Sequence, residues 1–515
     1  MPQHKKISTF ALLASSTAGI IGSGWLLGPL ACARVAGPAA LITWPIAGIL
    51  MVIVAIPFVI LARNIPTTGG TVRYFQMSYG HFAGFSISWI SWLAWAAVAP
   101  IETMALIQYS TNYIPNLMTH GHDPVLTNIG LTTAIILTSL ISTINGCGIH
   151  IYNKANYFIL AFKVFIPTIT VFLLLKDHFN PTNVLQNPNF MPYGLKSIAI
   201  ALPIAGVIYS LIGFNPAVQL SAETKNPQKS IPIAIFGSLI FCTILYTLVQ
   251  LAFIGALPKS SLADGWNHLS FAGSTGPFAG LLTIAGFVFF VKALYVDAVV
   301  SPFGTGMVQS LATSRLTVGM AENGYFPSCF SVRNKHGSPV NAIILNTIIG
   351  YIFFLPFPSW QHMVGFLVSC LSLGYIVGPL SLAALGKSNS NIKISQLARH
   401  LVCLSSFYIC SLIIFWCGWS VIAKLTTVFI TGYLILFIIF TYNKKTRNKL
   451  KNLQIKHGCW IVLYIAGISI LSYLSSFGGT GLIKFGPDFF VIAIFVLITY
   501  LIANFLAPPV AKNLP

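Results

Sequence analysis

Long apolar segments, separated by short polar loops, recur along the whole chain. An apolar helix needs about 18 residues to cross a bilayer, and fourteen segments approach or exceed that length. They cover residues 9–34, 38–62, 82–112, 126–146, 155–175, 197–221, 232–257, 277–312, 340–357, 361–386, 402–422, 425–442, 458–476 and 487–507. Without the last pair the number is twelve. The pattern predicts an all-α polytopic membrane protein with 12–14 spans and no separate soluble domain.

The composition agrees with a chain that lies mostly inside a bilayer. Of its 515 residues, 56% are hydrophobic and only 7% are charged, whereas soluble domains carry about 25% charged residues. The first apolar segment follows Lys5 and Lys6, as in a signal peptide, but it is long and many others follow. We therefore expect this segment to remain as a helix.

The charge distribution predicts the orientation of the chain. Its formal net charge of +20 raises the possibility of a nucleic-acid partner. With the N-terminus in the cytoplasm, however, 20 Lys and Arg residues fall on the inner side, 6 on the outer side, and Lys163 and Lys292 within spans. This bias follows the positive-inside rule. It predicts cytoplasmic ends at residues 1–8 and 508–515, attraction to anionic membrane lipids, and no nucleic-acid partner.

Two apolar segments contain residues that interrupt a helix. The first is GIIGSGW at residues 19–25, and the second is LIGFNP at residues 211–216. Unpaired backbone inside a bilayer is costly unless it lines a cavity or meets a ligand, and paired interruptions in two halves indicate a transporter site. Because they fall in spans 1 and 6, they predict a five-plus-five inverted repeat. The alternative for span 1 is close helix packing through Gly24 and Gly28.

Three motifs carry a resemblance to a known family. They are the glycine break around Ser23, the exit of span 6 with Gly213 and Phe214 followed by SAETKNPQKSIPIAI at 221–235, and SRLTVGMAENGYFP at 314–327. In this order they resemble the amino acid–polyamine–organocation (APC) superfamily. The resemblance implies a LeuT-like inverted-repeat fold and alternating-access transport of amino acids or related amines.

The resemblance also implies a division of the chain. The transporter core would cover residues 9–386, with halves at about 9–175 and 197–386, and residues 402–507 would form accessory C-terminal helices. Three shorter stretches resemble the bacterial aspartate:proton symporter branch. These stretches are APIE at 99–102, YVD at 295–297 and SPFGTG at 301–306.

The break in span 1 is the expected site for a substrate carboxylate. Backbone N–H groups at Gly22, Ser23 and Gly24 leave the helix ladder there, and the start of a half-helix favours an anion. Freed carbonyls would accept the substrate ammonium group. The expected acceptors are at Ile20, Tyr209 and Ile212.

Further residues are expected to shape the same pocket. They are Gly213, Phe214 and Asn215 in span 6 and Thr305 and Gly306 in span 8. Phe214 is expected either to close over the ligand as a gate or to serve ordinary packing.

Two acidic residues fall within spans, where a carboxylate is costly and usually functional. The resemblance places Glu102 on span 3 facing the substrate, where it would take up a proton or pair with a cationic group. Asp297 on span 8 is assigned to proton coupling, and the alternative is a buried ion pair with Lys292. An acidic substrate beside both carboxylates would be repelled unless one of them is protonated or paired.

Lys163 in span 5 is a further candidate for proton coupling. Several APC members have a lysine on this helix whose ammonium takes the place of a sodium ion, and the resemblance implies the same role here, near Ser301. The alternative is a lysine that snorkels to the inner surface.

Other function classes lack the residues they need. The chain has no HExxH or GxSxG motif, so we expect neither an enzyme, a metal site nor a cofactor. Its nine cysteines are scattered without a CxxC pair, which predicts reduced packing residues. The expected function is proton-coupled amino acid symport in a bacterial inner membrane. An exchanger and, less favoured, a polyamine or organic cation transporter are the alternatives, and the amino acid and the oligomeric state remain open.

Overall fold

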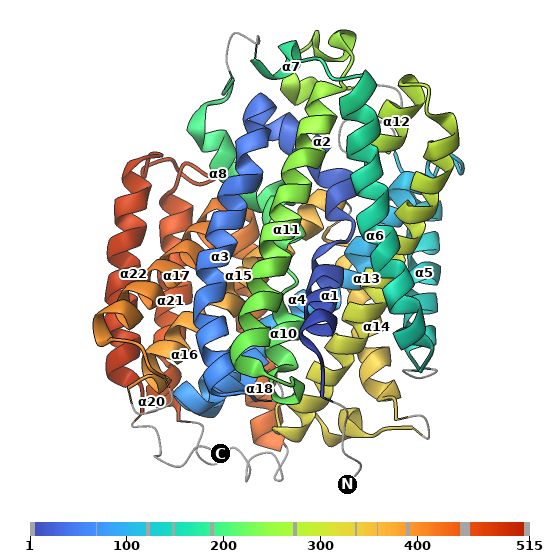
Figure 1. Cartoon of the computed structure of the whole chain (residues 1–515). Helices are drawn as coiled ribbons and strands as arrows, with labels where there is room; N and C mark the ends of the chain where they lie inside the picture. Colours follow the sequence, from blue (N-terminus) through green and yellow to red (C-terminus); the bar gives the residue numbers. More distant parts are fainter. Residues whose placement is uncertain are drawn as a thin grey trace.

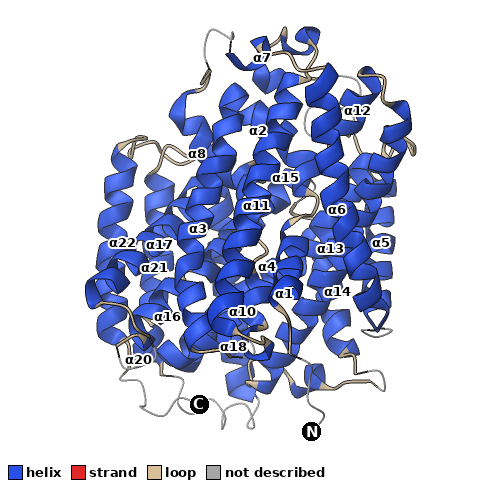
Figure 2. Ribbon diagram, in the orientation of Figure 1, coloured by secondary structure: helices blue, strands red, loops and turns tan. Residues whose placement is uncertain are grey.

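Every apolar segment of the sequence lies on one or more helices of the computed structural model. The structure describes residues 6–67, 70–119, 124–146, 150–185, 190–270, 276–334, 337–357, 359–387, 392–442 and 454–508. Within these ranges the chain forms helices and three isolated bridges but no extended strand. Figure 2 shows the helices joined by loops mainly at the two ends of the bundle. The all-α prediction is therefore confirmed.

The helices fall into three consecutive groups along the chain. The first comprises α1 (Thr9–Ile20), α2 (Gly24–Ala36), α3 (Ala40–Asn64), α4 (Gly70–Ser110), α5 (Asn128–Gly146), α6 (His150–Asp177) and the short α7 (Thr182–Leu185). The second comprises α8 (Gly194–Ile204), α9 (Val207–Leu211), α10 (Asn215–Gln219), α11 (Pro227–Gly255), α12 (Pro277–Ile284), α13 (Val288–Glu322), α14 (Val340–Phe353), α15 (Trp360–Tyr375) and α16 (Val377–Leu385). The third comprises α17 (Gln396–Trp416), α18 (Trp419–Tyr442), α20 (Ile455–Gly458), α21 (Trp460–Leu474) and α22 (Pro487–Leu506). Short 3₁₀ helices are η1 (Gly37–Ala39), η2 (Ser221–Glu223), η3 (Lys259–Leu262), η4 (Trp266–His268) and η5 (Ser328–Ser331).

The described helices have the length and hydropathy of a multi-pass membrane protein. Eleven stretches are long and apolar enough to cross a membrane, and the first of them runs through α2 and α3. Shorter apolar helices, namely α1, α8 and α14, lie on the remaining predicted segments. The protein is thus an integral multi-pass membrane protein, and its predicted spans all coincide with helices.

Helices from distant parts of the chain pack against one another in the centre. The long α4 packs against α13 and α15, while α3 and α1 pack against α11. In the apolar windows, 94% of the residues on α4 and 100% of those on α15–α16 are buried, against 28% on α22. The C-terminal helices α17, α21 and α22 lie along one side of the bundle (Figure 1), where α17 contacts α3 and α15. The central helices can therefore carry polar side chains away from lipid.

Both predicted interruptions are present. The first segment breaks between α1 and α2, with Ile21 in an extended conformation. The sixth breaks between α9 and α10, where Ile212 is extended and Gly213 has φ of +152°. The two breaks touch, because a Cβ on Gly19 would lie 2.8 Å from the carbonyl oxygen of Gly213. This contact requires two glycines and brings the freed backbone groups of both segments together.

Several boundaries differ from the prediction. The predicted single helix at 277–312 is two helices, because the chain turns at Gly286 with φ of +83°. The sixth segment has a second interruption at Gly206, with φ of +81°, which was not predicted. Segment 11 begins at Gln396 instead of 402, because the Ser395 hydroxyl caps the backbone N–H of Ala398.

The cysteines in the described residues are unpaired, and six of them are buried. They serve packing, as predicted. Cys147 lies outside the described residues, as do most of the predicted cytoplasmic ends at 1–8 and 508–515.

We predict that Gly213→Ala lowers the unfolding temperature in detergent by several degrees. A left-handed φ costs a residue with a Cβ about 1–3 kcal/mol, and the new Cβ would overlap the Gly19 carbonyl. Gly365→Ala is the matched control, because Gly365 is buried in α15 with no atom within 4 Å of its Cβ position. Thermal unfolding followed by tryptophan fluorescence compares the two. Equal unfolding temperatures would contradict the close contact of the two breaks.

Candidate functional site

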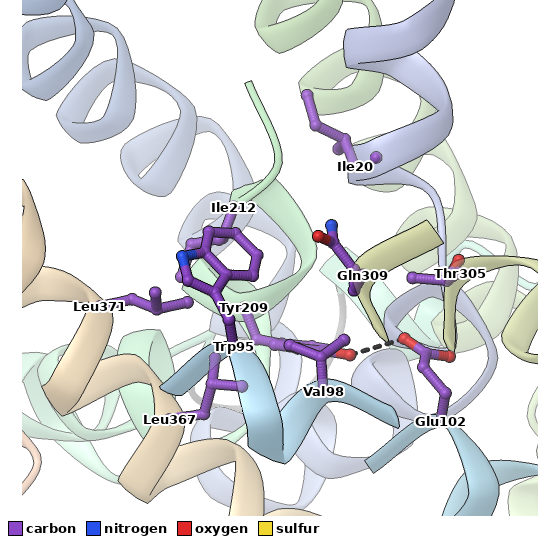
Figure 3. A pocket seen from close by; sticks show the side chains of 12 residues that line it. Ile20, Trp95, Val98, Glu102, Tyr209, Ile212, Thr305, Gln309, Leu367 and Leu371 are labelled. Carbon is purple, nitrogen blue, oxygen red and sulfur yellow. Dashed lines mark hydrogen bonds between the residues drawn. The ribbon is translucent and has the colours of Figure 1, made fainter. Parts of the chain in front are cut away.

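A pocket lies where the two breaks meet α4, α13 and α15. About 320 Å³ of space there is not filled by atoms, and this volume includes space open to solvent. Figure 3 shows side chains from these elements converging on it. Its lining residues are Gly19, Ile20, Gly22, Trp95, Val98, Glu102, Tyr209, Ile212, Thr305, Gln309, Leu367 and Leu371.

Glu102 joins α4 to both interrupted segments. Its side chain is 1% exposed. Its Oε2 accepts a hydrogen bond from the backbone N–H of Ser23 at 3.0 Å, and its Oε1 accepts one from the Tyr209 hydroxyl at 2.6 Å (Figure 3). A Cβ on Gly22 would lie 2.7 Å from Oε1. The glycine at this position therefore makes room for the carboxyl group.

Lys163 on α6 holds the other end of the same break. Its side chain is 1% exposed. Its Nζ donates to the carbonyl of Ile21 at 2.8 Å, to the carbonyl of Ala18 at 3.3 Å and to the Thr305 hydroxyl. A cation suits the carbonyl end of α1, where the helix dipole is negative. The snorkelling alternative is therefore wrong.

Asp297 lies on α13 without a hydrogen-bond partner. Neither carboxyl oxygen has one, and the same is true of the nearby Ser301 hydroxyl one helical turn further along. The Trp25 indole lies beside the carboxyl group, but its N–H also has no partner within hydrogen-bond geometry. Lys292 is exposed, so the predicted ion pair between Lys292 and Asp297 is wrong.

Three of the backbone groups expected to bind substrate have partners in the structure. The Ser23 N–H is held by Glu102. The Ile20 carbonyl accepts from the Tyr246 hydroxyl at 3.2 Å, and the Tyr209 carbonyl accepts from the Ile212 N–H at 3.1 Å. Tyr209 also reaches the pocket through its side chain, which the prediction for its carbonyl did not include.

Other predicted residues lie behind the pocket instead of lining it. Phe214 is 0% exposed and stacks on Tyr375, with ring centroids 5.3 Å apart. The amide of Asn215 donates to the Tyr375 hydroxyl at 3.3 Å. This arrangement matches the packing alternative for Phe214.

Glycines behind the pocket serve close approach. Gly24 lies against Ser210, Gly213 against Gly19, and Gly306 against Ile141. Their contribution is to let the helices approach, and none of them lines the pocket.

Sequence reasoning missed several residues that line the pocket. Trp95 and Val98 lie on α4 two turns and one turn before Glu102, and Gln309 lies one turn after Thr305 on α13. Helical periodicity from Glu102 and Thr305 indicates these positions. Leu367 and Leu371 on α15 have no comparable signal in the sequence.

Trp360 on α15 was also not predicted. Its indole N–H donates to the Ser23 hydroxyl at 3.1 Å. Its ring meets Tyr209 edge to face, with centroids 6.0 Å apart. A second pocket, with about 400 Å³ of empty space, lies on the other side of Trp360 near Leu30 and Arg34. Trp360 therefore lines this second pocket while touching Tyr209 of the first.

The fold and this pocket define the class of protein. A multi-pass helical bundle with two touching helix breaks at a buried pocket is the architecture of a secondary transporter. The family model for amino acid permeases matches residues 7–498. The chain belongs to the amino acid permease family, which confirms the resemblance to the APC superfamily.

Two relatives cover nearly the whole chain, and a third covers about two thirds of it. The glutamate/serine transporter AimA of Bacillus subtilis (strain 168) is 33% identical over 509 residues, covering 96% of this chain and 93% of the relative. The aspartate-proton symporter of the same organism is 31% identical over 513 residues, covering 99% and 98%. The gamma-aminobutyric acid permease of Bacillus subtilis (strain 168) is 26% identical over 365 residues, covering 68% of this chain and 71% of the relative.

We predict that Trp360→Phe lowers the unfolding temperature more than Trp460→Phe. The first change removes the indole donor to Ser23, and a buried hydrogen bond contributes about 0.5–1.5 kcal/mol. Trp460 is also buried, but its indole N–H has no partner. Thermal unfolding of both variants in the same detergent is the measurement. A larger loss in the Trp460 variant would mean that the Trp360 bond adds little stability.

Proposed function

We propose that the protein is a proton-coupled amino acid symporter that works by alternating access. The observation that carries this proposal is the pocket at the two helix breaks, with buried Glu102 and Lys163 bonded to the same break. Titratable groups inside a membrane protein are costly and mark ion or proton pathways. The printed names of the two Bacillus subtilis relatives, a glutamate/serine transporter and an aspartate-proton symporter, support the same function.

The substrate is an amino acid held between the breaks. The N–H groups around Ser23 suit its carboxylate, and the carbonyls around Ile20 and Ile212 suit its ammonium group. Thr305 and Gln309 present polar groups to the side chain, and Leu367 limits its size from the opposite wall (Figure 3). Serine, glutamate and aspartate are the first candidates, because the relatives are named for these amino acids.

Lys163 is the proposed proton carrier. When charged, it satisfies three acceptors and ties α6 to α1 and α13. When neutral, it has one donor fewer and loses the attraction to the carbonyl end of α1. The position of α1 against α6 then depends on the proton. Asp297 and Ser301, with their unpaired oxygens on α13, are proposed to lie on the proton path.

The chain is proposed to divide and orient as the sequence predicts. Residues 9–386 form the transporter core, with halves at about 9–175 and 197–386, and residues 402–507 are accessory. The protein lies in the bacterial inner membrane with both ends in the cytoplasm. The distribution of Lys and Arg supports this orientation. The start of α1 and the end of α22 lie toward the same end of the bundle (Figure 1).

Uptake into proteoliposomes tests the function. Labelled L-serine, L-glutamate and L-aspartate are supplied with and without an inward proton gradient. We expect saturable uptake of at least one of them, accumulation when the gradient is imposed, and loss of accumulation with a protonophore. Competition by each of the twenty amino acids then defines the range. Uptake that does not saturate and ignores the gradient would overturn the proposal.

Lys163→Met is expected to abolish gradient-driven accumulation and to leave amino acid binding within about tenfold of the wild type. Methionine keeps the length of the apolar stem but removes the charge and the three hydrogen bonds. Lys292→Met is the matched control, because Lys292 is exposed on α13. Accumulation and binding are measured on the same preparations. Normal accumulation by the Lys163 variant would remove this residue from the coupling mechanism.

A further inference from the structure

The structure places a carboxylate of the protein on the N–H group expected to hold the substrate. Ser23 itself does not line the pocket, but its N–H, at the break between α1 and α2, donates a hydrogen bond to Glu102 at 3.0 Å. The second oxygen of Glu102 accepts from Tyr209. Glu102 itself lines the pocket. Its terminal group therefore lies where an amino acid would present its own carboxylate.

The hydrogen bonds match an ionised carboxyl group. Each oxygen of Glu102 accepts from one donor. An ionised carboxylate only accepts, whereas a protonated one must donate through its O–H. Protonation therefore removes the charge from both bonds and turns one of the two oxygens into a donor, which the Tyr209 hydroxyl can accept only by turning its own O–H away. Hydrogen bonds to a charged group are roughly twice as strong as neutral ones, so a protonated Glu102 holds Ser23 less tightly.

We propose that Glu102 is an internal competitor for the substrate carboxylate, which binds at Ser23 only when Glu102 is protonated and has withdrawn. This inference rests on the proposed amino acid transport and adds how one proton is tied to one substrate molecule. The α-carboxylate of an amino acid has the same charge and acceptor geometry as ionised Glu102. Two carboxylates sharing one N–H would repel each other. Ionised Glu102 and the substrate carboxylate therefore cannot bind Ser23 at the same time.

The surroundings of Glu102 are consistent with this exchange. From α6 it faces Lys163, from α9 Tyr209, and from α11 Tyr246. Asp297 on α13 faces Lys163 as well. The Lys163 ammonium donates its hydrogen bonds to Ala18, Ile21 and Thr305, and the bonds of the Glu102 oxygens come from Ser23 and Tyr209. Glu102 can therefore leave Ser23 without breaking a hydrogen bond to Lys163.

The competition also restricts what can bind. A ligand with a carboxylate displaces the Glu102 carboxylate and takes its place, so the Ser23 N–H keeps a hydrogen-bond acceptor. A polyamine or other amine without a carboxylate has no group that can take the place of Glu102 at the Ser23 N–H. The proposal therefore predicts that such an amine binds without displacing Glu102 and without proton uptake.

Proton uptake on binding tests the proposal. L-serine, L-glutamate and L-aspartate are added to purified protein in weakly buffered solution containing a pH indicator, between pH 5 and pH 9. We expect about one proton to be taken up for each molecule bound once Glu102 is ionised. The affinity of the wild type should then fall up to about tenfold for each unit of pH. Binding without proton uptake at every pH would overturn the proposal.

Two variants assign the proton to a residue. Glu102→Gln should lose the proton uptake and the pH dependence, and at high pH should bind the amino acid about tenfold more tightly than the wild type, because a neutral amide competes less well. Asp264→Asn, which changes an exposed acidic residue, should behave as the wild type. Proton uptake that survives in the Glu102 variant, or disappears in the Asp264 variant, would overturn the proposal.

The outcomes separate this inference from the transport function. Gradient-driven uptake by the wild type, together with binding that takes up no proton, removes only the role of Glu102. Absence of saturable amino acid uptake in the wild type removes the transport function itself. If Glu102→Gln does not fold, the proton count of the wild type still decides the question.

Discussion

The contact between two interrupted helices is the constraint on which the rest of this structure depends. Backbone groups freed inside a membrane have no water to bind and cost several kcal/mol each, as an order of magnitude, when unpaired. The breaks touch at Gly19 and Gly213, where neither segment has room for a side chain. Their freed groups are then met by buried side chains of neighbouring helices, above all Glu102 and Lys163. The residues that stabilise the breaks are thus the same residues that are candidates for the transport chemistry.

The depth of burial makes this arrangement possible. In the apolar window on α4 that carries Glu102, 94% of the residues are buried, and in the window on α15–α16 all of them are. Helices such as α22, with 28% of the window buried, expose their apolar side chains on the outside. A polar group on α4 or α13 is therefore kept from lipid by other helices, which lets a chain with so few charged residues place three of them near its centre.

The two carboxyl groups at the centre of the structure differ in their hydrogen bonding. Lys163 stands between two carboxyl groups, those of Glu102 and Asp297. Glu102 has hydrogen-bond donors at both oxygens, whereas Asp297 has none. An unpaired carboxyl group at full burial favours its neutral form. Hydrogen bonding thus distinguishes two carboxyl groups that share one lysine, and this asymmetry suits a site in which protons move while the fold stays intact.

Local sequence carried enough information for the helices and their breaks. Runs of apolar residues predicted all the spans, and Gly213 with Pro216 predicted the second interruption, because these residue types cannot continue a helix in a bilayer. The same reasoning overlooked Gly206 and Gly286, which also turn the chain. Their neighbours are apolar, so their effect on the backbone was not evident from composition.

Partners across the fold were decided by tertiary structure. The sequence marked Glu102 and Lys163 as unusual charges in a membrane but did not specify which atoms they bind. Ser23 meets Glu102 across 79 positions of the chain, and Ile21 meets Lys163 across 142. Trp360 and Leu367 reach the site because α15 packs against α4 and α8. An apolar or aromatic residue on a buried helix carries no mark of the pocket that it lines, since its hydropathy is the same wherever the helix packs. The sequence by itself therefore determined where the apolar helices lie and where two of them break, and only packing decided which side chains meet at these two breaks.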